Sequence, residues 1–111
     1  MRTTLTLLAA AFLTVAFTGT ARADAAEIYG KKCASCHGKD GKGQTATGKK
    51  LSVKDLTDAK VQAEGKDDKW EKSIVEGVKN DQGKVVMVAS KGLSPDDVKG
   101  LVKICRDFKG K

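Results

Sequence analysis

The chain has 111 residues, with 21 Lys and Arg side chains, 14 Asp and Glu side chains, one histidine, three cysteines and one proline. This length excludes more than one small domain. From Asp24 onward, Leu, Ile, Val and Phe make up about a fifth of the residues, close to the proportion at which a highly charged chain stays disordered. A domain this poor in apolar side chains needs a staple such as a disulfide, a metal or a cofactor.

The first 23 residues have the pattern of a signal peptide. Arg2 and Arg22 are their only charged side chains, and the apolar stretch 5–17 is too short to span a bilayer. The stretch leads to Ala21-Arg22-Ala23, a small-x-small cleavage signal. We predict cleavage after Ala23, a signal peptide at 1–23, a single domain at 24–111 and a periplasmic location. Loss of the two arginines lowers the net charge from +7 to +5.

The first predicted helix of this domain leads into a cysteine motif. Asp24 followed by Glu27 resembles a capping box, and Glu27 can pair with Lys31 one turn later. The helix then reaches Cys33-Ala34-Ser35-Cys36-His37, the C-x-x-C-H arrangement of c-type haem attachment. Each thiol can add to one haem vinyl group, and the imidazole follows as the proximal iron ligand.

Two other interpretations of the motif remain open at this point. A thioredoxin-like redox pair needs a βαβ context, which no neighbouring segment predicts. A zinc site would recruit Cys33, Cys36, His37 and the distant Cys105, but the adjacent Cys36 and His37 would have to bind one ion. Export, the small apolar content and the five-residue motif together favour haem.

The middle of the chain predicts loops and two helices. The glycine-rich segment 38–43 and the polar run to Lys50 indicate a loop. Ser52 with Asp55 predicts a short capped helix through Leu56. From Asp67 the apolar residues have a helical spacing; they are Trp70, Ile74, Val75 and Val78. This spacing predicts a longer helix with the basic Lys79 at its C-terminal end.

The last third of the chain predicts a turn, an extended loop and one strong helix. Residues 80–83 form the turn, and the apolar run 85–88 is expected to be an extended loop because no other segment alternates as a partner strand would. Ser94 as N-cap and Pro95 at the first helical position begin the last helix. Its apolar face consists of Val98, Leu101, Val102, Cys105 and Phe108.

Cys105 and Met87 each have two interpretations. Cys105 is either a buried small apolar residue or a surface thiol that dimerises the protein. Met87 is either core filler or the sixth ligand of iron. A second imidazole ligand is impossible because the chain has one histidine, and Met87 is the only methionine that remains after Met1 leaves. A thioether would raise the reduction potential and fill the coordination shell, which favours a carrier over an enzyme.

The chain from Asp24 to Phe108 resembles the small class I monohaem cytochromes c of the bacterial periplasm. The residues that carry the resemblance are Tyr29, Cys33 to Gly38, Asp40 to Gly43, Gly48, Leu51, Ile74 to Gly77, Met87, Leu93 to Val98, Leu101, Val102 and Arg106. The resemblance implies an all-α cytochrome c fold of roughly three to four helices around one covalently bound haem c. It implies attachment through Cys33 and Cys36, with His37 and Met87 as iron ligands.

The chain also departs from the family pattern. Lys49 stands where many members have a proline whose carbonyl accepts a hydrogen bond from the proximal imidazole, and Val88 stands where proline commonly follows the axial methionine. Ile104 replaces a frequent aromatic residue, and Ala25 and Ala26 lie where glycine is common. The Lys49 carbonyl can still accept the hydrogen bond from His37, but without proline the turn is less rigid and is expected to hold the imidazole less firmly.

The resemblance and the charge together predict a monomeric, non-enzymatic carrier of single electrons with no membrane span and no nucleic-acid partner. If Met87 is not a ligand, the alternative is a five-coordinate haem sensor or a weak peroxidase. The lysines around the motif are either an ordinary solvated face or a surface that steers redox proteins with acidic docking surfaces; they are Lys31, Lys32, Lys39, Lys42, Lys49 and Lys50.

Overall fold

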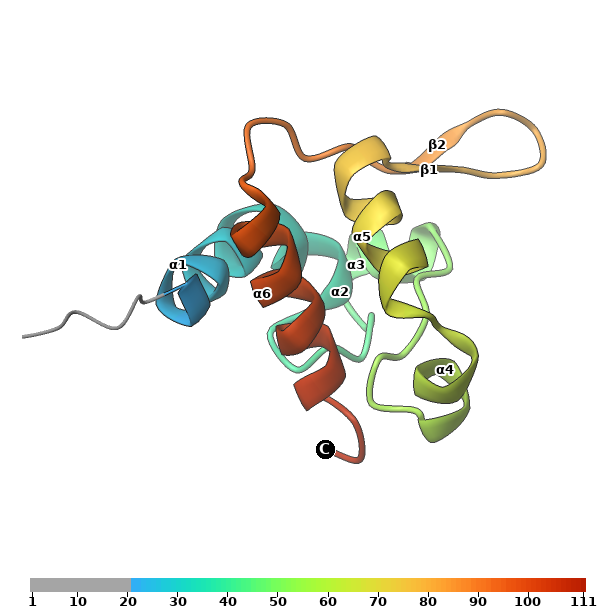
Figure 1. Cartoon of the computed structure of the whole chain (residues 1–111). Coiled ribbons are helices and arrows are strands. Elements are labelled where there is room, and N and C mark those ends of the chain that lie inside the picture. The colour runs from blue at the N-terminus through green and yellow to red at the C-terminus, as the bar shows by residue number, and fades with distance from the viewer. Residues whose placement is uncertain (1–20) are drawn as a thin grey trace, which may run out of the picture.

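The computed structural model describes residues 21–111 and is mostly helical (Figure 1). Residues 1–20 of the predicted signal peptide lie outside the described part. No helix of residues 21–111 is both long enough and apolar enough to cross a bilayer. The elements in chain order are α1 (Ala21–Ile28), the π-helical turn η1 (Tyr29–Cys33), α2 (Ala34–His37), α3 (Ala46–Lys50), α4 (Ala59–Glu64), α5 (Asp67–Glu76), β1 (Val78–Lys79), β2 (Val85–Met87) and α6 (Pro95–Asp107).

The N-terminal helix runs without a break into the cysteine motif. Asp24 lies in the first turn of α1, so the predicted capping box at Asp24 is wrong for this chain. An acidic residue in the first turn still suits the positive end of the helix dipole. The predicted pair is confirmed, with Lys31 Nζ 2.8 Å from Glu27 Oε1. Through η1 and α2 this helical segment ends at His37.

Two short helices, α3 and α4, lie before and after the small helix that we predicted at 52–56. The polar run before Lys50 contains α3, whose N-cap is Thr45. The predicted helix from Ser52 is wrong because Ser52 has a φ of 55°, in the left-handed region, and Asp55 accepts hydrogen bonds from Thr57 in a turn. The next helix is α4, where Asp58 Oδ1 accepts a hydrogen bond from the Lys60 N–H at 2.8 Å.

The helix predicted from Asp67 is confirmed but ends earlier than expected. Gly77, with a φ of 77°, ends α5, so Lys79 is not at its C-terminus. Instead Val78–Lys79 pairs as β1 with β2 in an antiparallel hairpin, with Val78 opposite Met87 and Lys79 opposite Val85. The prediction of an unpaired loop at 85–88 is therefore wrong. In Figure 1 this hairpin extends away from the helices beyond α5.

The last helix matches its prediction. Ser94 Oγ accepts a hydrogen bond from the Asp97 N–H at 3.1 Å, and Asp97 accepts one from the Ser94 N–H at 3.0 Å, which completes a capping box. Such reciprocal caps satisfy two donors that a helix leaves unpaired. The predicted apolar face of α6 turns inward, with Val98, Leu101 and Val102 buried.

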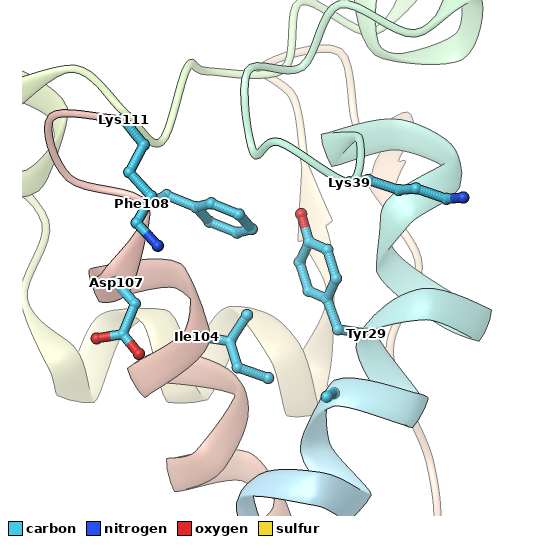
Figure 2. Close-up of a pocket in the computed structure, with 7 residues that line it drawn as sticks. Tyr29, Lys39, Ile104, Asp107, Phe108 and Lys111 are labelled. Atoms are coloured by element: carbon cyan, nitrogen blue, oxygen red, sulfur yellow. The ribbon is translucent and has the colours of Figure 1, made fainter.

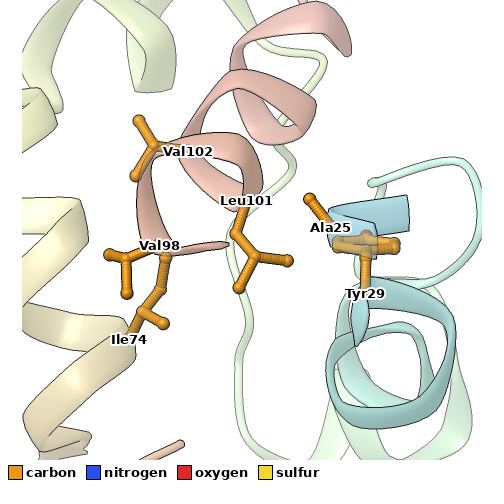
Figure 3. Packing of buried hydrophobic residues seen from close by; sticks show 6 residues of the cluster. All are labelled: Ala25, Tyr29, Ile74, Val98, Leu101 and Val102. Carbon is orange, nitrogen blue, oxygen red and sulfur yellow. The ribbon is translucent and has the colours of Figure 1, made fainter. Parts of the chain in front are cut away.

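The buried core lies where α1 and η1 meet α6 on one side and α5 meets α6 on the other (Figure 3). Ala25 and Tyr29 come from the N-terminal segment, and Ile74 comes from α5. Leu101, with 1% of its surface exposed, lies between these two contacts. Burying an aliphatic side chain of this kind contributes about 2 kcal/mol, so a cluster of this size supplies little stability for the chain length.

A polar junction closes the other end of α6 against α4 and α5. The buried Gln62 amide donates to the carbonyl oxygens of Leu56 at 2.6 Å and Cys105 at 2.8 Å. Arg106 donates to the carbonyl oxygens of Gln62 at 2.7 Å and Gly65 at 2.6 Å, and pairs with Asp67 at 2.7 Å. Its guanidinium also lies 4.0 Å from the centre of the Trp70 ring.

Candidate haem attachment site

The three motif residues lie within one turn and a half of helix. Cys33 ends η1 and is the N-cap of α2, whereas Cys36 and His37 are the last two residues of α2. All three side chains are half-buried. The helical conformation places the two thiols, three residues apart, on the same side of the chain, as attachment to two vinyl groups of one macrocycle requires.

Neighbouring segments hold the main chain of the motif by its carbonyl oxygens. Gly43 N–H donates to the His37 carbonyl at 2.8 Å, and the Tyr29 hydroxyl donates to the Gly38 carbonyl at 2.6 Å. Gly38 itself leaves the helix with a φ of 82°, in the region that glycine adopts most easily. The motif is therefore fixed by partners both before and after it in the chain.

Burial also sets the electrostatics of the site. Desolvation lowers the pKa of the His37 imidazole, which favours the neutral form that binds metal ions. Desolvation raises the pKa of the Cys33 thiol, with Lys32 opposing this shift. The Nδ1 atom of His37 is buried and has no hydrogen-bond partner among the described residues. A buried polar atom without a partner ordinarily needs one, so the ring nitrogen Nδ1 retains an unused hydrogen-bonding position.

The structure lends no support to the zinc and thioredoxin-like interpretations. Residues 21–111 contain no group of three or more His, Cys, Asp or Glu side chains placed to hold a metal ion, so Cys105 does not complete a site with Cys33, Cys36 and His37. No disulfide joins any two of Cys33, Cys36 and Cys105. The only sheet in this range is a two-stranded antiparallel hairpin and not the βαβ unit of a thioredoxin.

Met87 lies apart from the motif in the chain but borders the same core cluster. It is the last residue of β2, is half-buried, and packs against the cluster that Cys33 also contacts. The end of this strand lies close to the C-terminal end of α5, because a Cβ on Gly77 would lie 2.6 Å from the Met87 carbonyl oxygen. The chain that follows is bonded to α5 by Ser90 N–H to the Ile74 carbonyl at 2.8 Å.

Cys105 is partly buried on the inner face of α6 and packs against the core cluster. Desolvation raises the pKa of its thiol to about 12. A thiol with such a pKa is almost entirely protonated at neutral pH and is a weak nucleophile. These features agree with the interpretation of Cys105 as an apolar core residue.

A separate hollow of about 290 Å³ opens between η1 and the C-terminal end of α6 (Figure 2). Tyr29, Ile104 and Phe108 form its apolar wall, and the rings of Tyr29 and Phe108 lie 5.6 Å apart, centre to centre. None of Cys33, Cys36, His37 and Met87 lines this hollow. It is therefore distinct from the candidate attachment site.

Comparison with known proteins establishes the family of the chain. The family model described as cytochrome c matches residues 23–103. The chain belongs to the cytochrome c family. In structure this cytochrome c is similar to Kustc0563, a c-type cytochrome, with a TM-score of 0.66 and 34% identity over 78% of this chain and 98% of that one. It is also similar to a tyrosine-to-phenylalanine variant of Kustc0563, with a TM-score of 0.64 and 33% identity over 78% and 99% of the two chains. No curated protein sequence matches it.

Family membership confirms the predicted fold class and the predicted cofactor, a covalently attached haem c with its iron. The residues of this cytochrome c fit that group on three observations. Two half-buried thiols lie on one helical segment, the half-buried imidazole that follows them has a pKa lowered by desolvation, and the small apolar core is bordered by partly buried apolar residues on several elements. A macrocycle that joins these residues would supply the apolar mass that the composition lacks.

Gly48, Gly77 and Arg106 carry the family resemblance, but sequence reasoning missed their structural roles and missed Thr45 and Gln62 altogether. Thr45 and Gly48 dock α3 on the motif, Gly77 brings β2 close to α5, and Gln62 with Arg106 closes the α4 junction. The signals were present for some of them, because Thr45 and Asp58 are good N-cap residues that directly precede α3 and α4. No local pattern marks the roles of Gln62 and Gly77, since both depend on residues that are far away or in another element.

Proposed function

We propose that this cytochrome c is an exported carrier of single electrons, in which Cys33 and Cys36 attach one haem and His37 and Met87 bind its iron. The placement of both thiols and the only histidine on one short helical segment carries the proposal. When bound, the haem supplies a one-electron Fe(III)/Fe(II) couple. The protein residues supply attachment, ligand orientation and exclusion of water.

The proposed ligands are held by different parts of the fold. Hydrogen bonds to the carbonyls of His37 and Gly38 hold the imidazole side, while the short contact at Gly77 and the Ser90–Ile74 hydrogen bond hold the strand of Met87. A neutral imidazole and a thioether together leave the iron no open position for a substrate. The proposal is therefore a carrier and not an enzyme, and a sensor or weak peroxidase would require Met87 to be absent from the iron.

The proposed partners are redox proteins with acidic docking surfaces. The six lysines that flank the motif in sequence are all exposed, and Asp40 is the only acidic residue in the same segment 31–50; they are Lys31, Lys32, Lys39, Lys42, Lys49 and Lys50. Exposed like charges raise the association rate with an oppositely charged partner, and salt screens this effect. We expect electron-transfer rates with an acidic redox protein to fall steeply as salt increases. A rate that is independent of salt would contradict a steering role.

A pyridine haemochrome assay and intact mass spectrometry test the proposal on protein made with a cytochrome maturation system. We expect a c-type haemochrome spectrum and the mass of residues 24–111 plus one haem. In the ferric state, methionine ligation gives a weak red absorption band. We expect Met87→Ala to lose this band and to show a high-spin spectrum. A colourless protein with alkylatable thiols at Cys33 and Cys36 would overturn the attachment, and a wild-type high-spin spectrum would overturn the role of Met87.

A further inference from the structure

The short helix α3 is bonded directly to the cysteine motif by one side chain. Thr45 is the N-cap of α3, and its Oγ1 accepts a hydrogen bond from the Gly48 N–H at 2.9 Å. The same hydroxyl donates to the carbonyl oxygen of Cys36 at 2.9 Å. A hydroxyl has one donor and two acceptor positions, so Thr45 can cap the helix and hold the motif at the same time.

The contact between α3 and the motif is close enough to exclude a side chain. Gly48 is buried, and a Cβ at this position would overlap the carbonyl oxygen of Cys36 and would lie 2.9 Å from Thr45 Oγ1. The Gly48 carbonyl accepts from Val53 N–H at 2.9 Å, which anchors the far end of the same segment. The position of α3 relative to Cys36 is therefore set by both a hydrogen bond and a steric limit.

The carbonyl group of Lys49 is engaged elsewhere. It accepts a hydrogen bond from the Ser52 N–H at 3.3 Å at the end of α3. His37 Nδ1 has no partner in the described part of the chain. The main chain of the motif is instead held on both sides of His37, at the carbonyl of Cys36 by Thr45 and at the carbonyl of His37 by Gly43.

We propose that Thr45 is a positioning residue for His37, which sets the orientation of the imidazole through the Cys36 carbonyl and not through the imidazole itself. This inference rests on the proposed ligation of iron by His37. A side chain whose main-chain carbonyls on both sides are bonded has less freedom to rotate with its backbone. Loss of the Thr45 hydroxyl removes the hydrogen bond to the Cys36 carbonyl and frees the peptide between Cys36 and His37. It also leaves the N–H of the buried Gly48 unpaired.

Proton NMR of the ferric, haem-loaded full protein tests this role. The hyperfine shifts of the four haem methyl groups depend on the orientation of the axial ligands and do not depend on global stability under native conditions. Thr45→Val removes both hydrogen bonds and keeps the side-chain shape, so we expect a changed spread of methyl shifts. Thr45→Ser keeps the hydroxyl and should retain the wild-type pattern. Thr47→Val, at an exposed position of the same helix, is the matched control and should also retain it.

Each outcome separates this inference from the proposed function. If the wild type binds haem and Thr45→Val shows the same haem methyl shifts as the wild type, the role of Thr45 alone is overturned. A colourless wild type overturns the proposed function and this inference with it. If Thr45→Val does not mature, Thr45→Ala takes its place in the same comparison with Thr45→Ser, because it also removes the hydroxyl that donates to the Cys36 carbonyl. Methyl shifts that are unchanged in Thr45→Ala would overturn the inference.

Discussion

The thiol of Cys105 is the clearest case of one residue whose chemistry depends on its surroundings. It lies on α6 against the core, and burial raises its pKa to about 12, whereas an unfolded chain has a cysteine pKa of about 8.5. Because the folded-state pKa is the higher one, the stabilisation from the neutral thiol is complete below about pH 8.5. It is lost as the pH rises from there toward the folded-state value.

This shift predicts the reactivity of Cys105. At pH 8.5, iodoacetamide should modify the native haem-loaded protein at least about a hundredfold more slowly than the same protein in urea, because alkylation needs the thiolate and access to it. Mass spectrometry of the modified protein measures both rates. Cys105→Ser should show no modification in either state if Cys33 and Cys36 are bonded to haem. Equal rates, or a dimer that reductant dissolves, would mean that the thiol is exposed.

Arg106 is the polar partner of three groups, the carbonyl oxygens of Gln62 and Gly65 and the carboxylate of Asp67. Arg106→Met keeps the apolar stem but removes the donors to the carbonyls of Gln62 and Gly65 and the pair with Asp67. We expect the free energy of unfolding to fall by about 2–3 kcal/mol, which is typical for stranded polar groups in partly buried positions. Urea titration measures the loss. Lys103→Met on the exposed side of α6 should change the stability by less than about 0.5 kcal/mol.

At the scale of elements, the hairpin that carries Met87 depends on a glycine in the preceding segment. Gly77 has a φ of 77°, and Gly77→Ala would place a Cβ 2.6 Å from the Met87 carbonyl oxygen. Gly83 at the hairpin tip has a φ of 75° but open space around it. Alanine would therefore meet the same unfavourable φ at both positions, but only at position 77 would its Cβ also meet a neighbouring atom.

This pair allows a matched experiment on the proposed Met87 ligation. Gly83→Ala should cost about 1 kcal/mol of stability from the positive φ alone and leave the ferric absorption spectrum unchanged. Gly77→Ala should cost more and should weaken the red absorption band of methionine ligation, because β2 must move. Absorption spectra of the two ferric proteins at equal haem content provide the measurement. An unchanged band in Gly77→Ala would show that the position of Met87 is independent of this contact.

The elements differ in how far the sequence alone could predict them. The last helix was predicted correctly because Ser94, Pro95 and Asp97 are local signals within one turn. The motif was also predictable, since C-x-x-C-H joins all its chemistry within five consecutive residues. The helices α3 and α4 are too short and too polar to show a periodic pattern, and β1 and β2 pair across a register irregularity that alternation cannot reveal. The contact at Gly48 depends on tertiary structure alone.

At the scale of the whole molecule, the described core is small. The buried apolar residues of the described part are Ala25, Tyr29, Leu56, Ile74, Val98, Leu101 and Val102. Val75, Val85 and Val88, which lie near the end of α5 and in the hairpin segment, remain exposed to 44%, 49% and 79%. A folded domain of this length ordinarily needs a larger apolar core or a bound group that adds to it.

The small core predicts that folding depends on haem attachment. A Cys33→Ala, Cys36→Ala double variant cannot hold the haem covalently, and we expect it to lose most of its helical circular dichroism signal at 25 °C. Loss of two small side chains alone would not unfold a stable domain, and Ser35→Ala in the same segment serves as a control that keeps both attachment thiols. Native helicity in the double variant would show that the polypeptide folds without its cofactor.

Trp70 is the only indole of this cytochrome, and it lies at the junction where Arg106 covers its ring and Gly65 packs against it. Its fluorescence therefore has a single origin. Emission from this residue would report when the α4 and α5 segments separate from the last helix. The protein thus contains a natural optical probe for the order in which its parts come apart.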